Sequence, residues 1–223
     1  MDILLNYVEH GSGFPLILLH GNGEDHTYFS KQIEFFSHFY RVVAIDTRGH
    51  GHSPRGNAPF TISQFADDLL NFLNRLGLEK AHILGFSDGG NIALTFALRH
   101  PERVEKLILN GANLNPAGVK WTVQVPIILG YRIASLFGEK AKQNTELLGL
   151  MVNEPNFVPG DLKGLTIPTL VIAGNRDMIK NSHTHEIAAS LPNAELVILQ
   201  GDHFVANRNP DAFNQAVHSF LSR

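Results

Sequence analysis

Short apolar runs alternate with longer amphipathic segments along most of this chain. Each run is rich in Leu or β-branched residues and is bounded by Gly, Asp, Asn or Pro, which predicts a strand. We expect strands at Leu16–Leu19, Val42–Ile45, His82–Leu84, Val104–Leu109, Thr169–Ala173 and Glu195–Leu199, with an extra edge strand at Ile3–Val8. The amphipathic segments predict helices at about Tyr28–Ser37, Ile62–Leu76, Gly89–Arg99, Ser182–Ser190 and Pro210–Leu221.

The alternation of strands and helices predicts the fold class. It is typical of an α/β fold: an open, mostly parallel, doubly wound sheet with helices on both faces. The chain has 223 residues, which suits a single domain over residues 1–223. In such sheets functional groups gather at the carboxyl ends of the strands.

One stretch, at about residues 114–160, breaks this alternation. It is too long for a simple crossover between two strands, and it is apolar, with Trp121 near its start and further apolar residues at helical spacing. We interpret it as a short helical cap inserted over the sheet. A peripheral helical hairpin that completes the core is the alternative.

The strongest chemical signal is Gly85-Phe86-Ser87-Asp88-Gly89, between a predicted strand and a predicted helix. A Gly-x-Ser-x-Gly turn in this setting exposes a serine hydroxyl at the end of a strand, and its glycines avoid collisions with neighbouring backbone. Ser87 is therefore a candidate nucleophile. The alternative is that Ser87 merely caps the following helix.

A serine nucleophile needs a base, and the base needs an orienting acid. Asp177 follows the strand Thr169–Ala173, and His203 follows the strand Glu195–Leu199. The order Ser87, Asp177, His203 predicts a catalytic triad. Asp202 is a weaker candidate because sequence neighbours seldom face one another. The strand Val104–Leu109 ends in Asn110-Gly111-Ala112, without a carboxylate.

Acyl transfer also requires donors for an oxyanion. The backbone N–H of Asp88, at the predicted start of a helix, is one candidate. The other is the N–H of Asn22, in the His20-Gly21-Asn22-Gly23 loop after the first predicted central strand. That loop can also be interpreted as an ordinary Gly-rich turn.

Composition excludes several other classes of function. Without cysteine, the chain has neither disulfides nor thiolate metal sites. A net charge of -3 argues against a nucleic-acid partner. The apolar stretch near residues 123–136 is too short and interrupted to span a membrane, and no signal peptide is evident, so we expect a cytoplasmic protein. Among the 12 histidines, the pairs His50/His52 and His183/His185 lack a third ligand at metal-site spacing, so we expect no metal.

Taken together, these motifs resemble the α/β-hydrolase family over nearly the whole chain. The similar segments are His20–Gly23, Asp46–Ser53, Gly85–Gly90, His100–Val104, Ile167–Asp177 and Gly201–Phe204. The resemblance implies an acyl-serine mechanism that needs no cofactor. Because a serine holds the nucleophile position, the branches with an aspartate nucleophile are disfavoured. The cap of this chain is shorter than the family pattern, which implies an open pocket.

We therefore expect a carboxylesterase-like serine hydrolase that cleaves a small ester or related acyl bond. Asp88, Trp121 and Phe204 are candidate substrate-binding residues. The resemblance includes esterases of amino-acid esters with a similar Ser-Asp-Gly-Gly turn, so Asp88 could attract a substrate ammonium group; alternatively it complements a helix N-terminus. The same site would also suit a slow receptor-like relative, an acyltransferase, a haloperoxidase, a lactonase or a carbon–carbon bond hydrolase. The apolar cap could also serve as a homodimer surface.

Overall fold

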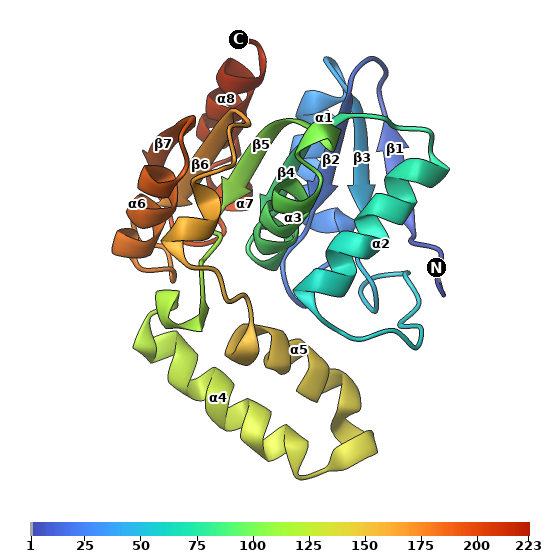
Figure 1. The fold of residues 1–223 in the computed structure, drawn as a ribbon, viewed down its shortest axis with the longest axis vertical. Helices are drawn as coiled ribbons and strands as arrows, with labels where there is room; N and C mark the ends of the chain where they lie inside the picture. The colour runs from blue at the N-terminus through green and yellow to red at the C-terminus, as the bar shows by residue number, and fades with distance from the viewer. Residues whose placement is uncertain (1) are drawn as a thin grey trace.

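Seven strands form one sheet, in the order β1-β3-β2-β4-β5-β6-β7 (Figure 1). The computed structural model describes residues 2–223. β1 pairs antiparallel with β3, and every other pairing is parallel. The strands are β1 (Tyr7–His10), β2 (Pro15–Leu19), β3 (Arg41–Ile45), β4 (Ala81–Phe86), β5 (Val104–Asn110), β6 (Thr169–Gly174) and β7 (Ala194–Leu199). The predicted open, mostly parallel sheet is confirmed.

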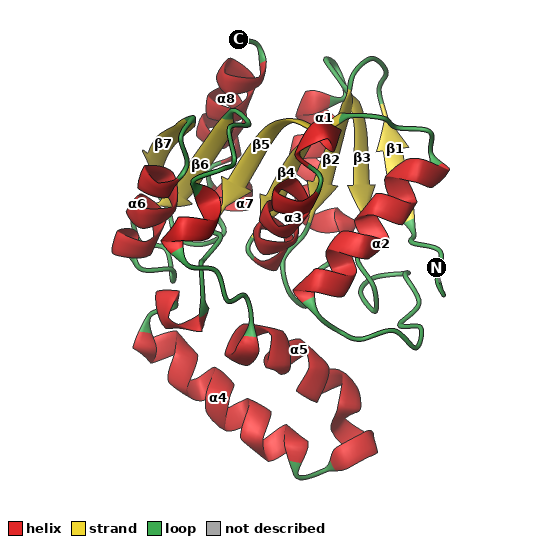
Figure 2. Cartoon of the chain, in the orientation of Figure 1, coloured by secondary structure: helices red, strands yellow, loops and turns green. Residues whose placement is uncertain are grey.

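Helices cover both faces of the sheet and create two apolar cores (Figure 2). Side chains of a strand alternate between faces, so Ile17 and Leu19 join one core while Leu16 and Leu18 join the other. The first core lies under α2 (Ile62–Arg75), α3 (Asp88–Arg99) and α6 (Asn181–Ser190), and the second under α1 (Ser30–Phe36), α7 (Val205–Arg208) and α8 (Pro210–Leu221). The sheet is therefore sandwiched, as a parallel sheet requires.

The six predicted central strands and five predicted helices are all present, with small shifts of their ends. The first predicted helix begins as a 3-10 turn, His26–Phe29, before α1. The four-residue α7 is too short to produce a helical periodicity, and it was not predicted.

The predicted edge strand Ile3–Val8 is wrong in position, because β1 spans Tyr7–His10. Ile3 and Leu5 are buried at 6% and 7% exposure, but they fill the core from an extended segment outside the sheet. The alternating apolar pattern therefore marked core packing, while pairing with β3 begins only at Tyr7.

The segment between β5 and β6 contains two long helices, α4 (Trp121–Ser135) and α5 (Lys142–Asn153), which we call the cap. They lie beyond the carboxyl ends of the strands (Figure 1). The two helices pack on each other, and Gln124 Nε2 donates to the Met151 carbonyl at 3.3 Å. The predicted helical character of this stretch is found. Its assignment as an insertion within a single domain stays a prediction.

Arg48, after β3, is fully buried with its charge paired on two sides. Its guanidinium donates to Asp68 at 2.7 Å through both Nε and Nη2, and to Asp2 at 2.7 and 3.0 Å. Asp68 is only 2% exposed. Because both charges lie out of water, each requires the other. This pair ties the loop after β3 to α2.

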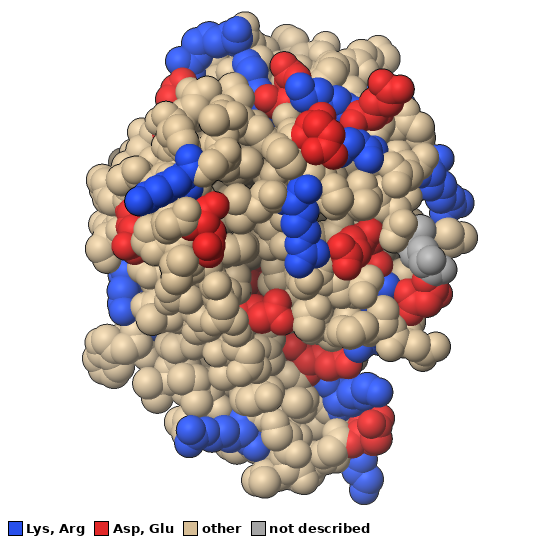
Figure 3. Space-filling model, in the orientation of Figure 1, with Lys and Arg blue, Asp and Glu red and all other residues tan. Residues whose placement is uncertain are grey.

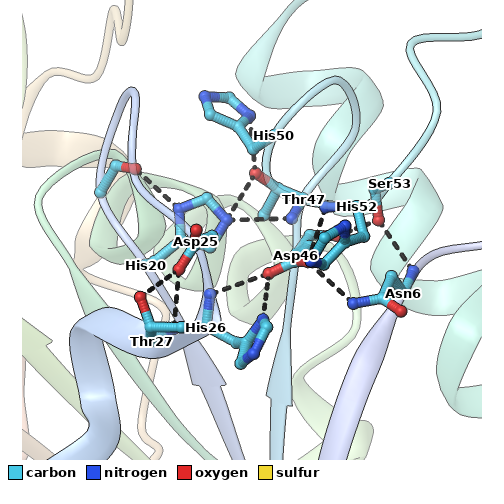
Figure 4. A network of polar contacts seen from close by, with 11 residues as sticks. Asn6, His20, Asp25, His26, Thr27, Asp46, Thr47, His50, His52 and Ser53 are labelled. Carbon is cyan, nitrogen blue, oxygen red and sulfur yellow. Dashed lines mark hydrogen bonds and ion pairs between the residues drawn. The ribbon is translucent and has the colours of Figure 1, made fainter.

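A network of buried polar groups joins the loops after β2 and β3 (Figure 4). His20 Nδ1 lies 2.7 Å from the Gly21 carbonyl, and its Nε2 accepts the Thr47 N–H at 3.0 Å. Both contacts are satisfied only by the neutral ring, protonated at Nδ1. Burial, together with repulsion from His50, lowers the pKa of His20 to about 4.

No helix among residues 2–223 is long and apolar enough to cross a membrane. On the face drawn in Figure 3, positive and negative side chains are interspersed, without a continuous basic surface.

Removing the charge of Asp68 should destabilise the fold, because Arg48 would keep a buried and incompletely paired charge. We expect Asp68→Asn to lower the free energy of unfolding by about 3 kcal/mol. The neighbouring Asp67→Asn removes an exposed ion pair with Arg99 and should cost less than about 1 kcal/mol. Urea unfolding of both variants measures the difference; similar losses would contradict a special role for Asp68.

Stability should fall as the pH decreases from about 6.5 to about 4, partly because of His20. The unfolded chain takes up a proton near pH 6.5, whereas the folded state holds His20 neutral down to about pH 4. His20 thus contributes a slope of at most about 1.4 kcal/mol per pH unit within this window. Unfolding at several pH values should show a smaller slope for His20→Asn. The exposed control His10→Asn should retain the wild-type slope.

Candidate active site

The turn between β4 and α3 holds Ser87 in a strained conformation. Its backbone has φ 53° and ψ -120°, and Ser87 is the single non-glycine residue with positive φ among residues 2–223. A Cβ at Gly85 would collide with the backbone of Gly89, and one at Gly89 would collide with the Leu19 carbonyl. The two glycines therefore allow β2, β4 and α3 to meet closely at the serine.

The structure brings together the three residues predicted as a triad. His203 Nε2 lies 3.0 Å from Ser87 Oγ, and His203 Nδ1 lies 2.7 Å from Asp177 Oδ1. Asp177 is fully buried, and its Oδ1 also accepts the Ile179 N–H at 2.8 Å. Asp202 is not part of this arrangement, because its carboxylate pairs with Arg208 and accepts the Phe204 N–H.

β5 ends next to Gly111, which supplies no carboxylate and leaves room for the ring of His203. Gly111 has φ +64°, and a Cβ there would lie 2.8 Å from His203 Cε1 and 3.0 Å from its Nδ1. A side chain at position 111 would therefore displace the imidazole and would stand on a backbone conformation that favours glycine. This explains why the sequence has glycine where an alternative acid could have stood.

The two backbone N–H groups predicted as oxyanion donors have no hydrogen-bond partner in the part of the chain that the structure describes. Among the described residues, no hydrogen bond occupies the N–H of Asn22 or that of Asp88. The neighbouring Gly21 N–H, by contrast, donates to Glu24 Oε2 at 3.1 Å. The pattern of free and used donors suits the predicted oxyanion role of these two residues.

Asp88 is the first residue of α3, and one of its two carboxylate oxygens has no hydrogen-bond partner among the described residues. Its Oδ1 accepts from Asn91 Nδ2 at 3.1 Å, whereas its buried Oδ2 has no partner among residues 2–223. Burial raises the pKa of Asp88 to about 6, opposed by the side-chain amides of Asn91 and Asn22. Both sequence interpretations of Asp88, a helix-terminal charge and a site for a cation, stay open.

The two other candidate substrate-binding residues differ in position. Phe204 is 38% exposed and lies close to the triad, with its ring centroid 5.6 Å from that of His203. Trp121 begins α4 and is 74% exposed, and no hydrogen bond or ring contact among the described residues links it to the triad. The structure thus brings Phe204, but not Trp121, to His203.

Sequence reasoning missed three residues around this site. Burial raises the pKa of Glu24 to about 7, and its carboxylate is close enough to His203 to interact with its charge. Lys120 Nζ donates to the Asp177 carbonyl. Glu154 accepts the Ile62 N–H at 2.7 Å and raises the pKa of Asp88. None lies in a recognisable motif; Lys120 and Glu154 reach the site from the ends of the cap.

A cluster of Asp25, His26 and Asp46 has the ligand spacing of a metal site, within 4.8 Å. Asp46, however, accepts hydrogen bonds on both carboxylate oxygens, from His26, His52 and Asn6 (Figure 4). Burial alone would raise the pKa of Asp46. The hydrogen bonds from the N–H groups of His52 and His26 outweigh burial and lower the pKa to about 2. We therefore interpret the cluster as a structural network.

Comparisons with known proteins agree with this architecture. The profile of the alpha/beta hydrolase fold family matches residues 15–132. The chain is 32% identical to a Caulobacter sp. (strain K31) protein assigned as the carbamate hydrolase RutD, covering 93% of this chain and 90% of that protein. It is 28% identical to the 2-hydroxymuconate semialdehyde hydrolase of Pseudomonas putida, covering 97% and 90%.

A solved structure shares the fold over the whole length. The enol-lactonase of Burkholderia xenovorans LB400 superposes with a TM-score of 0.85, at 23% identity, covering 99% of this chain and 97% of that one. The profile match and the full-length relatives confirm the resemblance found in the sequence. The chain belongs to the alpha/beta hydrolase fold family and is a hydrolase of that type.

Proposed function

We propose that this protein is a serine hydrolase that cleaves a small carboxylic ester or a related acyl bond. The observation that carries the proposal is the continuous path from Ser87 Oγ through His203 to Asp177, at 3.0 and 2.7 Å. The two free N–H groups of Asn22 and Asp88 support it. The relatives are named for carbamate, semialdehyde and enol-lactone substrates. Only the lactone is itself an ester, and it belongs to a structure at 23% identity, so the ester substrate is proposed from the site.

In the proposed mechanism, His203 Nε2 removes the proton of Ser87 as Oγ attacks the carbonyl carbon. Asp177 holds the ring by its Nδ1–H and stabilises the imidazolium that forms. The N–H groups of Asn22 and Asp88 bind the oxyanion of the tetrahedral intermediate. His203 then protonates the leaving group. In the second half of the reaction His203 removes a proton from water, the water attacks the acyl-serine, and His203 returns the proton to Ser87 Oγ as the acid product leaves.

Asp88 suggests a finer substrate preference. A buried carboxylate with a pKa of about 6 is mostly ionised at neutral pH, and its buried Oδ2 has no partner among residues 2–223, so a substrate ammonium group that reached it would compensate its charge. We therefore propose an acyl group that carries an amine as the preferred substrate. The residue's place in the first turn of α3 is compatible with this role.

Replacing the nucleophile should abolish turnover. We expect Ser87→Ala to lower kcat for p-nitrophenyl acetate and butyrate by about 10⁶-fold, the scale known for a triad serine. Intact-protein mass spectrometry should show one fluorophosphonate adduct on the wild type and none on Ser87→Ala. Ser182→Ala, an exposed serine on α6, should behave as wild type. Failure of the folded wild type to be labelled would favour the receptor-like alternative.

The Asp88 proposal predicts a preference that depends on charge. Alanine benzyl ester should have a kcat/KM at least about tenfold above that of benzyl propionate, because a hydrogen bond between charged groups contributes about 1.5 kcal/mol or more, and about 1.4 kcal/mol corresponds to a factor of ten. The preference should disappear in Asp88→Asn. In the wild type it should weaken below about pH 6, where the carboxylate is protonated. Equal values for the two esters, unaltered by the substitution, would refute the assignment.

A further inference from the structure

The cap contacts two of the loops that form the candidate site. At its start, the Lys120 N–H donates to the Met178 carbonyl at 2.8 Å, and Lys120 Nζ donates to the carbonyl of Asp177. At α5, the Leu147 carbonyl accepts from Asn22 Nδ2 at 2.7 Å. The cap is thus joined to the acid loop just before α4 and to the oxyanion loop at the middle of α5.

Asn22 has two separate hydrogen-bonding groups with different partners. Its backbone N–H is unoccupied and is the proposed oxyanion donor, while its side-chain amide donates to the Leu147 carbonyl of the cap and also interacts with Asp88, whose pKa it lowers. The residue lies between Gly21 and Gly23, and Gly23 has φ +74°. A glycine-flanked loop has considerable conformational freedom. Gly21 is already held by His20 and Glu24, and the bond to Leu147 adds a restraint on Asn22 itself.

An ion pair fixes the same turn of α5. Glu146, next to Leu147, receives two parallel bonds from Arg55, at 2.8 Å from Nε and 2.6 Å from Nη2. Arg55 Nη1 donates to the Ala58 carbonyl at 2.7 Å, and the guanidinium lies 4.9 Å from the centre of the Phe60 ring. The side chains of Arg55 and Glu146 are only 31% and 19% exposed. A two-bond pair with this geometry sets position as well as energy.

We propose that α5 positions the oxyanion donor: the Asn22 amide links the loop to Leu147, and the Arg55–Glu146 pair holds Leu147 in place. Arg55, Glu146 and the side chain of Asn22 are then positioning residues. The role rests on the proposed function of the Asn22 N–H. Since an oxyanion forms only during the reaction, misplacing its donor should lower kcat and leave KM nearly unchanged.

Charge reversal tests this proposal kinetically, with p-nitrophenyl butyrate as substrate. Glu146→Arg places two cations together and should lower kcat about tenfold or more, with KM within about twofold. The double variant Arg55→Glu/Glu146→Arg should recover most of the loss. Glu139→Gln, which removes an exposed cap pair with Lys142, should match wild type.

A double-mutant cycle tests the route through Asn22. Asn22→Ala keeps the backbone N–H but removes both the bond to Leu147 and the amide's interaction with Asp88, so it should itself lower kcat about tenfold. In that background, Glu146→Arg should add less than about twofold, because both changes disrupt one connection. Independent, multiplicative losses would overturn the proposal, as would a Glu146→Arg variant with wild-type kcat.

Hydrogen exchange separates this proposal from the proposed function. In Glu146→Arg, a peptide covering residues 16–28 should exchange faster than in wild type, and the charge-swapped double variant should restore protection. Faster exchange in a protein without esterase activity would support the coupling and refute the function. Unchanged exchange in an enzyme that hydrolyses the ester would refute the coupling and support the proposed function. If Glu146→Arg does not fold, the milder Glu146→Gln, which removes the charge and keeps the side-chain size, should lower kcat and speed exchange in the same direction, and wild-type values for both would overturn the proposal.

Discussion

The close approach of β2, β4 and α3 at Ser87 is the steric constraint on which the rest of the site depends. The serine keeps its unfavourable φ of 53° because the Ser87 N–H bonds to Asn110 and the Gly90 and Asn91 N–H groups bond to its carbonyl. These bonds join the turn to β5 and α3. The turn fixes where Oγ stands, and the loops after β2, β6 and β7 supply the groups around it. Their arrangement follows from the parallel sheet, because strands in one direction end at one edge.

Much of this arrangement could be predicted from the sequence because the constraints are local. A glycine-serine-glycine turn between a strand and a helix has few conformations, and an acid and a histidine placed just after strands must reach the same edge. The positions of Ser87, Asp177 and His203 next to one another followed from these rules. Their catalytic roles stay a prediction.

Other features could not be predicted because they depend on contacts distant in sequence. Ile3 and Leu5 carry the alternation of a strand, yet whether such a segment pairs or only packs is decided by β3. Glu24 and Glu154 differ from other glutamates because burial raises their pKa values, and burial cannot be read from the sequence. The link of Asn22 to Leu147 spans 125 residues, and no periodicity carries that information.

Gly111 limits the evolutionary substitutions by which this protein could move its acid from one strand end to another. In principle, the acid that orients the histidine could stand at the end of β5 or at the end of β6. Here the His203 ring occupies the space that a side chain at position 111 would need. A mutation that introduced a carboxylate there would first displace the imidazole, before any loss of Asp177 could make the new acid useful. The exchange of one acid position for the other is therefore closed to single substitutions, and Asp177 is retained by a steric barrier as well as by its chemistry.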